Sequence, residues 1–373
     1  MAAPLESADV VIIGGGPAGS SLALGLGESG LRVVILDRAR FPRDKLCAGW
    51  VTPPVFEALG IEPEAYAMDH VLQPIHGFRV GVSGGRESAT HSDEVVSYGI
   101  RRCEFDAHLL SRTDSDVREG ESLRSLERQA SGWLVNDSIQ APLVVGAGGH
   151  FCPVARRLML GPKSEEPLIA AQEIEFRMTP EQAKACPVAA ETPQISFLRD
   201  LKGYGWIFRK GDWLNVGLGR QDREHLSKHL ESFLGELRRA GRLPPDMPKD
   251  FHGHAYLLYD QAPRRLFDEG LALIGDAAGL AYPRSGEGIR PAVESGLLLA
   301  RTLRNASSAD KLGAPETLAG YERDLLDRFG SREHRPGPTD RLPAPLVRFL
   351  AARLLGHPRI ARDIVVRRWF LRA

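Results

Sequence analysis

The sequence predicts an α/β protein: a nucleotide-binding domain with a parallel sheet, an antiparallel sheet inserted into it, and a helical tail. Two observations predict this. Short runs of β-branched and aliphatic residues are typical of strands buried on both faces; they are residues 9–14, 32–37, 143–149 and 271–279. Residues 70–100 and 168–220 instead hold short segments in which apolar and polar residues alternate, which indicates an antiparallel sheet with one covered face.

The remaining elements follow in order. The first run leads through a glycine-rich turn and a helical stretch to about Glu28 into the second run, which makes a βαβ unit. Residues 223–240 and 315–330 have the pattern of amphipathic surface helices. A proline-rich stretch, 335–345, precedes two short helical stretches separated by His357-Pro358.

These elements predict three parts of the chain. We expect a discontinuous nucleotide-binding domain formed by residues 1–70, 96–165 and 266–310. The inserted substrate domain is expected over residues 71–95 and 166–265, and a C-terminal helical segment over residues 311–373.

Composition excludes several classes of protein. The 373 residues are 43% hydrophobic and 26% charged with a formal net charge of zero, so nothing indicates nucleic-acid binding. Neither a C-x-x-C motif nor a pairing with histidine occurs among the four cysteines, which predicts reduced thiols and no metal site. The first strand begins about nine residues in, and no apolar run approaches the roughly 18 residues of a membrane span. We therefore expect a cytoplasmic protein without a signal peptide.

The charge is concentrated at the end of the chain. From residue 341 onward there are eight arginines and one aspartate, a local charge of +7. Apolar side chains recur there at helical spacing: Leu346, Leu350 and Leu354, with Trp369 and Phe370 beside arginines. Such a segment suits peripheral contact with the anionic inner face of a membrane. The alternative is a helix packed on the acidic remainder of the chain, and both stay open.

Residues Gly14-Gly15-Gly16-Pro17-Ala18-Gly19 fit the pattern G-x-G-x-x-G. Glycines allow a tight turn and let the backbone approach a pyrophosphate, which the N–H groups of a helix N-terminus favour. The pattern alone is weak, but a buried strand precedes it and a helix follows. The next strand ends in Asp37, 23 residues after Gly14, where a carboxylate accepts hydrogen bonds from a ribose. A Rossmann-like dinucleotide site is therefore predicted, rather than a plain βα turn beside a solvated aspartate.

A second block favours a flavin over a nicotinamide dinucleotide. A strand delivers Gly275-Asp276, and Gly286-Glu287-Gly288 then opens a strongly helical stretch. An aspartate at a strand end suits a polyhydroxyl chain such as ribitol, and a glycine-lined helix N-terminus stabilises negative charge on a reduced flavin.

With this block and Arg102-Cys103-Glu104-Phe105-Asp106, the sequence resembles the FAD enzymes of the para-hydroxybenzoate hydroxylase type, which have a glutathione-reductase-like fold. Within them it is similar to the geranylgeranyl reductases. FPRDKLCAGW (41–50) resembles their FPR-x-K-x-C-G-G, and PRSGEGIRPAVESG (283–296) their P-x-x-GEGI-x-x-A-x-x-SG. YGWIF (204–208), followed by Gly217-Leu218-Gly219, resembles their Y-x-W-x-F-P…G-x-G. The resemblance covers roughly residues 8–305.

The resemblance implies FAD as the cofactor. The residues expected to bind it are Gly14, Gly16, Pro17, Ala18, Gly19, Asp37, Arg38, Lys45, Cys47, Ala48, Gly49, Arg102, Gly146, Ala147, Gly275, Asp276, Ala277, Pro283, Gly286, Glu287, Gly288 and Ile289. Catalytic roles are implied for Cys47, Tyr204 and Trp206, and substrate contacts for Tyr204, Trp206, Phe208, Gly217 and Gly219.

Three positions depart from the family pattern. Ala48 replaces a glycine, Arg209 a proline, and Gly148 the aspartate of the usual GADG motif. In the hydroxylases that aspartate is linked to flavin and NADPH handling. The external electron donor is therefore left open between NAD(P)H and a ferredoxin-like protein.

Alternatives remain for individual residues. Cys47 is either a thiol that gives a proton near the flavin or a small buried side chain. Tyr204, Trp206 and Phe208 alternate along one strand and share a face, which is either an aromatic wall for the substrate or the core of the inserted sheet. Arg43 or Lys45 pairs with phosphates or a substrate headgroup, or simply solvates the loop.

The leading hypothesis is an FAD-dependent oxidoreductase that reduces carbon–carbon double bonds of an isoprenoid or polyprenyl-type hydrophobic substrate. The alternative is an FAD-dependent monooxygenase that hydroxylates an aromatic or polyketide-like substrate. A halogenase is disfavoured because the stretch W-x-W-x-I-P is missing. A non-catalytic flavin-binding protein at a membrane surface is disfavoured because the aromatic strand is kept. The expected partners are a hydrophobic or lipid substrate and an electron-donor protein.

Overall fold

The chain forms two compact units, each assembled from three separate stretches. The structure is a computed structural model that describes residues 5–159, 166–222, 225–333 and 342–371. Unit 1 consists of residues 1–44, 103–166 and 256–333, and unit 2 of residues 45–102, 167–255 and 334–373. The predicted domain boundaries stay a prediction. The expected proline-rich joint falls largely on residues 334–341, outside the described residues.

The core of unit 1 is a six-stranded sheet in which neighbouring strands are parallel except at one edge. The strand order is β19-β20-β13-β2-β3-β9, and β19 is antiparallel to β20. The bounds are β2 Val10–Ile13, β3 Val33–Asp37, β9 Asp116–Glu119, β13 Leu143–Gly146, β19 Phe267–Asp268 and β20 Leu271–Leu273. The four apolar runs thus form adjacent parallel strands, and the predicted α/β fold class is confirmed.

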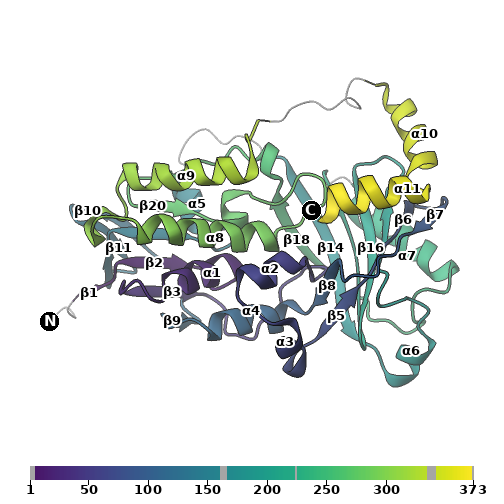
Figure 1. Ribbon diagram of the computed structural model, residues 1–373, viewed down its shortest axis with the longest axis horizontal. Helices are drawn as coiled ribbons and strands as arrows, with labels where there is room; N and C mark the ends of the chain where they lie inside the picture. Colours follow the sequence, from purple (N-terminus) through teal and green to yellow (C-terminus); the bar gives the residue numbers. More distant parts are fainter. Residues whose placement is uncertain (1–4, 160–165, 223–224, 334–341, 372–373) are drawn as a thin grey trace. The chain divides into compact units, whose positions relative to one another are not determined.

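Helices of unit 1 pack closely because small residues lie between them. α1 (Pro17–Leu26) lies against α8 (Ile289–Arg304), and α9 (Pro315–Phe329) lies beside α8 (Figure 1). A Cβ at Gly25 would lie 2.6 Å from the Cβ of Ala300, so a larger side chain would push α1 and α8 apart. The remaining helices of this unit are α4 Arg102–Ser111, which begins one residue before the unit does, and α5 Pro153–Leu158.

Unit 1 also contains a small sheet that the sequence did not predict. Its order is β1-β12-β11-β10, with bounds β1 Glu6–Ser7, β10 Leu126–Gln129, β11 Gly132–Val135 and β12 Ile139–Ala141. These strands are short and partly polar, so their pattern is weaker than that of the buried runs.

Unit 2 is built on a seven-stranded sheet with the order β18-β14-β17-β16-β15-β6-β7. The bounds are β6 Arg79–Val82, β7 Glu87–Ala89, β14 Leu168–Arg177, β15 Gln194–Phe197, β16 Gly203–Lys210, β17 Trp213–Arg220 and β18 His252–Leu257, whose last two residues belong to unit 1. The predicted antiparallel sheet is confirmed for β14, β15, β16 and β17.

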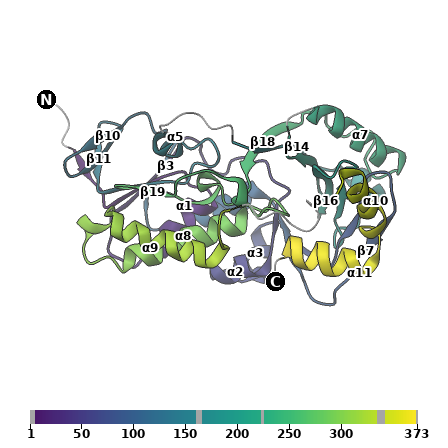
Figure 2. The same cartoon turned by 90° about the horizontal axis from the view of Figure 1, so that it is seen from above.

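Helices cover both faces of this sheet. α7 (Leu226–Arg239) packs on the face that carries Ile207, Leu214 and Val216. A C-terminal helix, Ala361–Leu371, packs on the opposite face with Trp206 and Phe208 (Figure 2).

The smaller elements of unit 2 are a three-stranded sheet and short helices. The sheet has the order β4-β8-β5, and the bounds are β4 Trp50–Val51, β5 Leu72–Ile75, β8 Ser97–Ile100, α2 Pro53–Ala58, α3 Pro63–Asp69, α6 Pro180–Ala185, α10 Ala344–Leu354 and α11 Pro358–Ile360. No helix in the described part of the chain is both long enough and apolar enough to cross a bilayer.

Candidate functional site

The first glycine-rich turn connects β2 to α1, and backbone atoms of the turn itself and of the loop after β13 lie close to its glycines. Gly14 has φ +116°, and a Cβ there would lie 2.6 Å from the carbonyl oxygen of Ala147. A Cβ at Gly19 would overlap the carbonyl oxygen of Gly14. α1 begins directly afterwards at Pro17, so the N–H groups of its first turn lie where a pyrophosphate binds in such folds.

Asp37, at the end of β3, is fixed beside this turn. Its Oδ2 accepts a hydrogen bond from the N–H of Gly15 at 2.7 Å, and its Oδ1 accepts one from the N–H of Ala39 at 2.8 Å. Each carboxylate oxygen has a further lone pair, so the group retains the capacity to accept ribose hydroxyls. The predicted pairing of the turn with this acid is present in the structure.

An ion pair places a cation at the same turn. Nη2 of Arg43 lies 3.2 Å from Oδ2 of Asp106, whose side chain is fully buried on α4. A Cβ at Gly16 would lie 3.3 Å from the same guanidinium nitrogen. Arg43 is therefore held next to the glycine turn, where it suits an anionic ligand.

The second glycine block, residues 275–276 and 286–288, lies at the N-termini of α1 and α8. A Cβ at Gly275 would lie 2.9 Å from the Cβ of Ala18 on α1, and one at Gly288 would lie 3.0 Å from Oδ1 of Asp276. Gly286 has φ +69°, and a Cβ there would overlap the hydroxyl of Tyr256. The Asp276 carboxylate thus lies at the start of α8.

Arg264 joins the two loops that follow β13 and β20. Its guanidinium donates to both carboxylate oxygens of Glu166 at 2.7 and 2.8 Å, to the carbonyl of His150 at 3.0 Å and to that of Ala277 at 2.8 Å. These hydrogen bonds hold the pKa of Glu166 below its ordinary value. Arg264 is 6% exposed, so it stabilises loop geometry from inside unit 1. Sequence reasoning did not single it out.

Unit 1 therefore brings together the predicted cofactor residues of three loops. Gly14, Gly16, Pro17, Ala18 and Gly19 form the turn and start of α1, with Asp37 beside them; Gly146 and Ala147 end β13; Gly275, Asp276 and Ala277 follow β20; Pro283, Gly286, Glu287, Gly288 and Ile289 lead into α8. Arg38 is exposed just beyond β3. A glycine cradle, a cation and two carboxylates fit the pyrophosphate and hydroxyl groups of FAD.

The face of the unit 2 sheet that holds the aromatic residues also holds charges. Direct cross-strand pairs place Glu173, Gly217 and Trp206 in one row and Glu175, Asn215 and Phe208 in the next. Lys210 follows on the same face of β16 and is 1% exposed.

The Cys47-Ala48-Gly49 segment is bound to this polar group. Asn215 donates from Nδ2 to the carbonyl of Cys47 at 3.1 Å, and Lys210 donates to the carbonyls of Ala48 at 2.9 Å and Ile100 at 2.8 Å. Lys210 also pairs with Glu175, and the neighbouring Glu173 is 4% exposed. Cys47 is half-buried.

Gly49 lies against the same lysine. A Cβ at Gly49, which has φ +67°, would lie 2.5 Å from Nζ of Lys210. Of the other two predicted cofactor residues in unit 2, Lys45 lies 3.1 Å from Nδ1 of His254, and Arg102, 9% exposed, starts α4.

The three predicted aromatic residues differ in exposure. Trp206 and Phe208 are 7% and 1% exposed, whereas Tyr204 is half-buried. Atoms of the Trp206 indole lie within 2.7 Å of where a Cβ of Gly217 would be, and its Nε1 donates to Asn215 at 2.7 Å. Gly217 therefore makes room for the indole, whereas a Cβ at Gly219 would make only ordinary van der Waals contacts.

The chain's own C-terminal helix covers this aromatic face. The ring of Phe370 stacks on Trp50 at 5.0 Å with an interplanar angle of 9°, and it meets Tyr204 edge-on at 5.6 Å. Phe370 is fully buried. It is therefore part of the core of unit 2. This helix packs on the chain itself, against an aromatic face of the sheet and not through an acidic surface as the alternative for the tail proposed.

Lys210, Glu173 and Asn215 were missed by sequence reasoning. A signal exists, because Lys210 continues the alternation of Tyr204, Trp206 and Phe208. The signal is hidden, since charged residues at such positions ordinarily face solvent.

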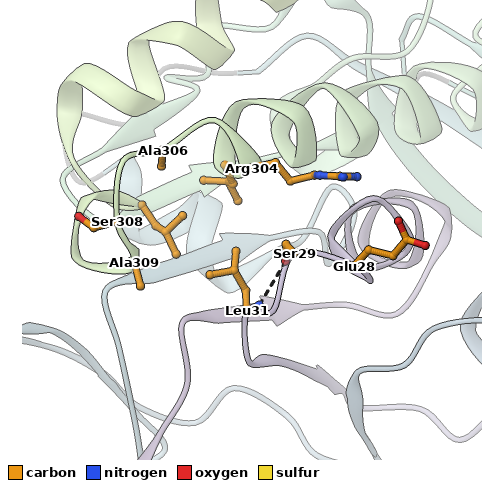
Figure 3. Close-up of a pocket in the computed structure, with 9 residues that line it drawn as sticks. Glu28, Ser29, Leu31, Arg304, Ala306, Ser308 and Ala309 are labelled. Atoms are coloured by element: carbon orange, nitrogen blue, oxygen red, sulfur yellow. Dashed lines mark hydrogen bonds between the residues drawn. The ribbon is translucent and has the colours of Figure 1, made fainter.

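The hollow shown in Figure 3 lies apart from the dinucleotide residues. It has a volume of about 380 Å³ and is lined by Glu28, Ser29, Leu31, Leu303, Arg304, Ala306, Ser308, Ala309 and Leu312. These residues lie at or just after the C-terminal ends of α1 and α8, whereas the glycine blocks lie at the N-terminal ends of those helices. A ten-residue helix is about 15 Å long, so the hollow is not the dinucleotide site.

Comparison with known proteins identifies the family. Residues 7–328 match the family described as FAD binding domain. The chain belongs to that family. The predicted cofactor, FAD, and the predicted class, an FAD-dependent oxidoreductase, are confirmed.

Two named reductases are similar to this chain. Digeranylgeranylglycerophospholipid reductase of Methanocaldococcus jannaschii is 28% identical over 333 residues, covering 84% of this chain and 81% of the relative. Menaquinone reductase of Mycobacterium tuberculosis is 29% identical over 325 residues, covering 80% and 77%. The predicted resemblance to geranylgeranyl reductases is thereby confirmed.

A solved structure shows the same fold. The geranylgeranyl bacteriochlorophyll reductase-like protein of Thermoplasma acidophilum has a TM-score of 0.77 at 20% identity, covering 97% of this chain and 98% of that one. At this identity the likeness concerns the fold alone.

Proposed function

We propose that this chain reduces carbon–carbon double bonds in an isoprenoid or polyprenyl-type chain, with FAD as cofactor. One observation supports this most: buried polar side chains fix the Cys47–Gly49 segment above an aromatic sheet face. The relatives support the same chemistry, because they are named as reductases of a digeranylgeranyl lipid and of menaquinone. A hydrophobic lipid substrate is consistent with both.

The protein residues would donate the proton and support the substrate surface. Bound FAD supplies the hydride in such a reduction. We assign the proton to Sγ of Cys47 or Oη of Tyr204, because both residues are half-buried and not fully enclosed. Trp206 and Phe208 are almost fully buried, so we assign them the support of this surface.

The test uses FAD-loaded protein reduced with dithionite without oxygen, so that the result does not depend on the electron donor. The reduced protein is mixed with a digeranylgeranyl lipid, and the products are weighed by mass spectrometry. We expect products that have gained two hydrogens. If the Cys47 thiol gives the proton, the rate of product formation should be at least about a hundredfold lower in Cys47→Ala. Cys186→Ala, a half-buried thiol elsewhere in unit 2, is the matched control. Oxygen insertion, seen only in air, would support the monooxygenase instead.

We further propose that α10 brings the enzyme to an anionic membrane surface. α10 has no buried residue, and its exposed apolar side chains have helical spacing: Leu346 (43% exposed), Phe349 (57%), Leu350 (36%) and Leu354 (43%). Arg348 and Arg353 lie on the same helix. Basic residues near an anionic bilayer contribute about 1 kcal/mol each, and apolar side chains insert at the interface.

Vesicle flotation tests this contact. Vesicles with anionic phosphatidylglycerol are expected to carry the protein upward, while phosphatidylcholine vesicles are not. Phe349→Ser is expected to weaken flotation, and Phe151→Ser is the matched control, since Phe151 is a 65% exposed phenylalanine of unit 1. Equal flotation of wild type and Phe349→Ser would remove α10 from the proposal.

A further inference from the structure

Three consecutive backbone carbonyls, those of residues 47–49, each accept a hydrogen bond from a different strand of unit 2. Nδ2 of Asn215 on β17 donates to the first at 3.1 Å, and Nζ of Lys210 on β16 donates to the second at 2.9 Å. The backbone N–H of Ile100, the last residue of β8, donates to the third at 2.7 Å. The path of this segment is therefore set by donors that are distant in sequence.

Lys210 makes more of these contacts than the other two donors. Its ammonium also donates to the carbonyl of Ile100 at 2.8 Å and pairs with the carboxylate of Glu175. An ammonium has three N–H groups, so the two carbonyls and the carboxylate use all of them. Lys210 thus joins Ala48 to the end of β8, from a side chain that is 1% exposed.

Two glycines leave the space that this side chain fills. A Cβ at Gly99 would lie 2.9 Å from Cγ of Lys210, and a Cβ at Gly49 would lie 2.5 Å from its Nζ. The lysine is therefore packed along its length, from the stem to the ammonium. A methionine at this position would fill the space of the stem but leave both carbonyls without their donor.

We propose that Lys210 is a positioning residue for Cys47, because its ammonium ties the Cys47–Gly49 segment to the end of β8. Lys210 acts through this segment, since all three of its N–H groups already have protein acceptors. The inference rests on the proposed function only in that Cys47 serves the reaction. The restraint on the segment is a property of the protein alone.

The test compares the alkylation of Cys47 in wild type and Lys210→Met, without substrate. FAD-loaded protein is treated with iodoacetamide between about pH 6 and 10, and each cysteine is followed by peptide mass spectrometry. The pH of half-maximal rate reports the ionisation of the thiol, which the loss of a nearby charge can shift. The plateau rate at high pH reports instead how freely the segment opens.

We expect the plateau rate of Cys47 to rise at least about tenfold in Lys210→Met, because two charge-assisted hydrogen bonds are lost. The plateau rate of Cys186, a half-buried thiol of the same unit, should stay the same. Lys228→Met, which removes an exposed lysine on α7, is the matched control and should change neither rate. Equal Cys47 plateaus in wild type and Lys210→Met would overturn the proposal. So would an equal rise at both cysteines, which indicates a general loosening of unit 2.

The fold of the variant is protected by a second cation. Nε of Arg101 lies 3.6 Å from Oε2 of Glu175, so this carboxylate keeps a partner when Lys210 is replaced. If Lys210→Met nevertheless fails to fold, the double variant with Glu175→Gln removes both charges, and the same rise is expected. Wild-type Cys47 that reacts as fast as in urea-unfolded protein would overturn the proposal, whether or not any variant folds.

A second measurement connects the restraint to the reaction. In alkene reduction, kcat of Lys210→Met should fall at least about tenfold while KM changes less than about twofold, because a displaced proton donor affects the chemical step. An unchanged kcat in a variant with a freed Cys47 would overturn the positioning role. If the wild type reduces no alkene, the alkylation result still stands, and the proposed function is rejected instead.

Discussion

Replacing Glu173 by glutamine should make the protein more stable at high pH and change little at low pH. The folded state raises the pKa of this carboxyl from its ordinary value of 4.5 to about 7, chiefly by burial. Between these values the folded protein binds more protons than the unfolded chain, so stability falls as the pH rises from about 4.5 to about 7. Above pH 7 the loss is complete.

The magnitude follows from the same two values. At about 1.4 kcal/mol per pKa unit, the ionised carboxyl costs about 3 kcal/mol at pH 8 and less than about 1 kcal/mol at pH 5. Glutamine lacks this cost, although its amide has its own packing cost. That packing cost is the same at both pH values. The gain of Glu173→Gln over wild type should therefore be about 2–3 kcal/mol larger at pH 8 than at pH 5.

Urea unfolding of FAD-loaded protein at the two pH values measures this difference. Tryptophan fluorescence is a suitable signal because four of the five tryptophans, residues 50, 206, 213 and 369, lie in unit 2. Glu231→Gln, which removes an exposed carboxyl on α7, is the control and should show no such difference. An equal effect of Glu173→Gln at pH 5 and pH 8 would refute the argument that burial of this charge destabilises the fold.

Three further outcomes are expected. Gly14→Ala should abolish flavin absorbance in the purified protein, because its Cβ would clash with backbone at φ +116°; a yellow variant would contradict this. In urea unfolding, Phe370→Ala should lower the free energy of unfolding by about 3–5 kcal/mol, and Phe349→Ala by less than about 0.5 kcal/mol. Similar losses in the two variants would contradict the burial of Phe370 and the exposure of Phe349. Arg264→Lys should lose at least about 2 kcal/mol in thermal unfolding, since lysine cannot donate to both oxygens of Glu166, and an unchanged melting temperature would rule that out.

The parts of the fold that were predictable are those that local pattern controls. A buried parallel strand needs an apolar run, and a dinucleotide turn needs glycines where backbone meets backbone, as at Gly14 and Gly19. Asp37 followed from spacing, because one helix separates β2 from β3. These features depend on neighbours that are close in sequence.

The buried charges could not be predicted, because their partners are distant in sequence. Lys210 meets Ala48 across 162 positions, and Arg264 meets His150 across 114. Seen without those partners, a lysine or glutamate in an alternating strand is ordinarily a solvent-facing residue. The aromatic alternation was visible, but burial by a helix from the other end of the chain was not.

That burial has a consequence for the protein during its synthesis. Phe370 follows Phe208 by 162 residues, and ribosomes add about 5–20 residues per second. For roughly 8–30 s, then, the nascent chain presents Trp50 and Phe208 on a sheet face that its last helix will later cover. We expect such an interval to make this enzyme dependent on chaperones while it is being made, and most vulnerable to aggregation when translation pauses late.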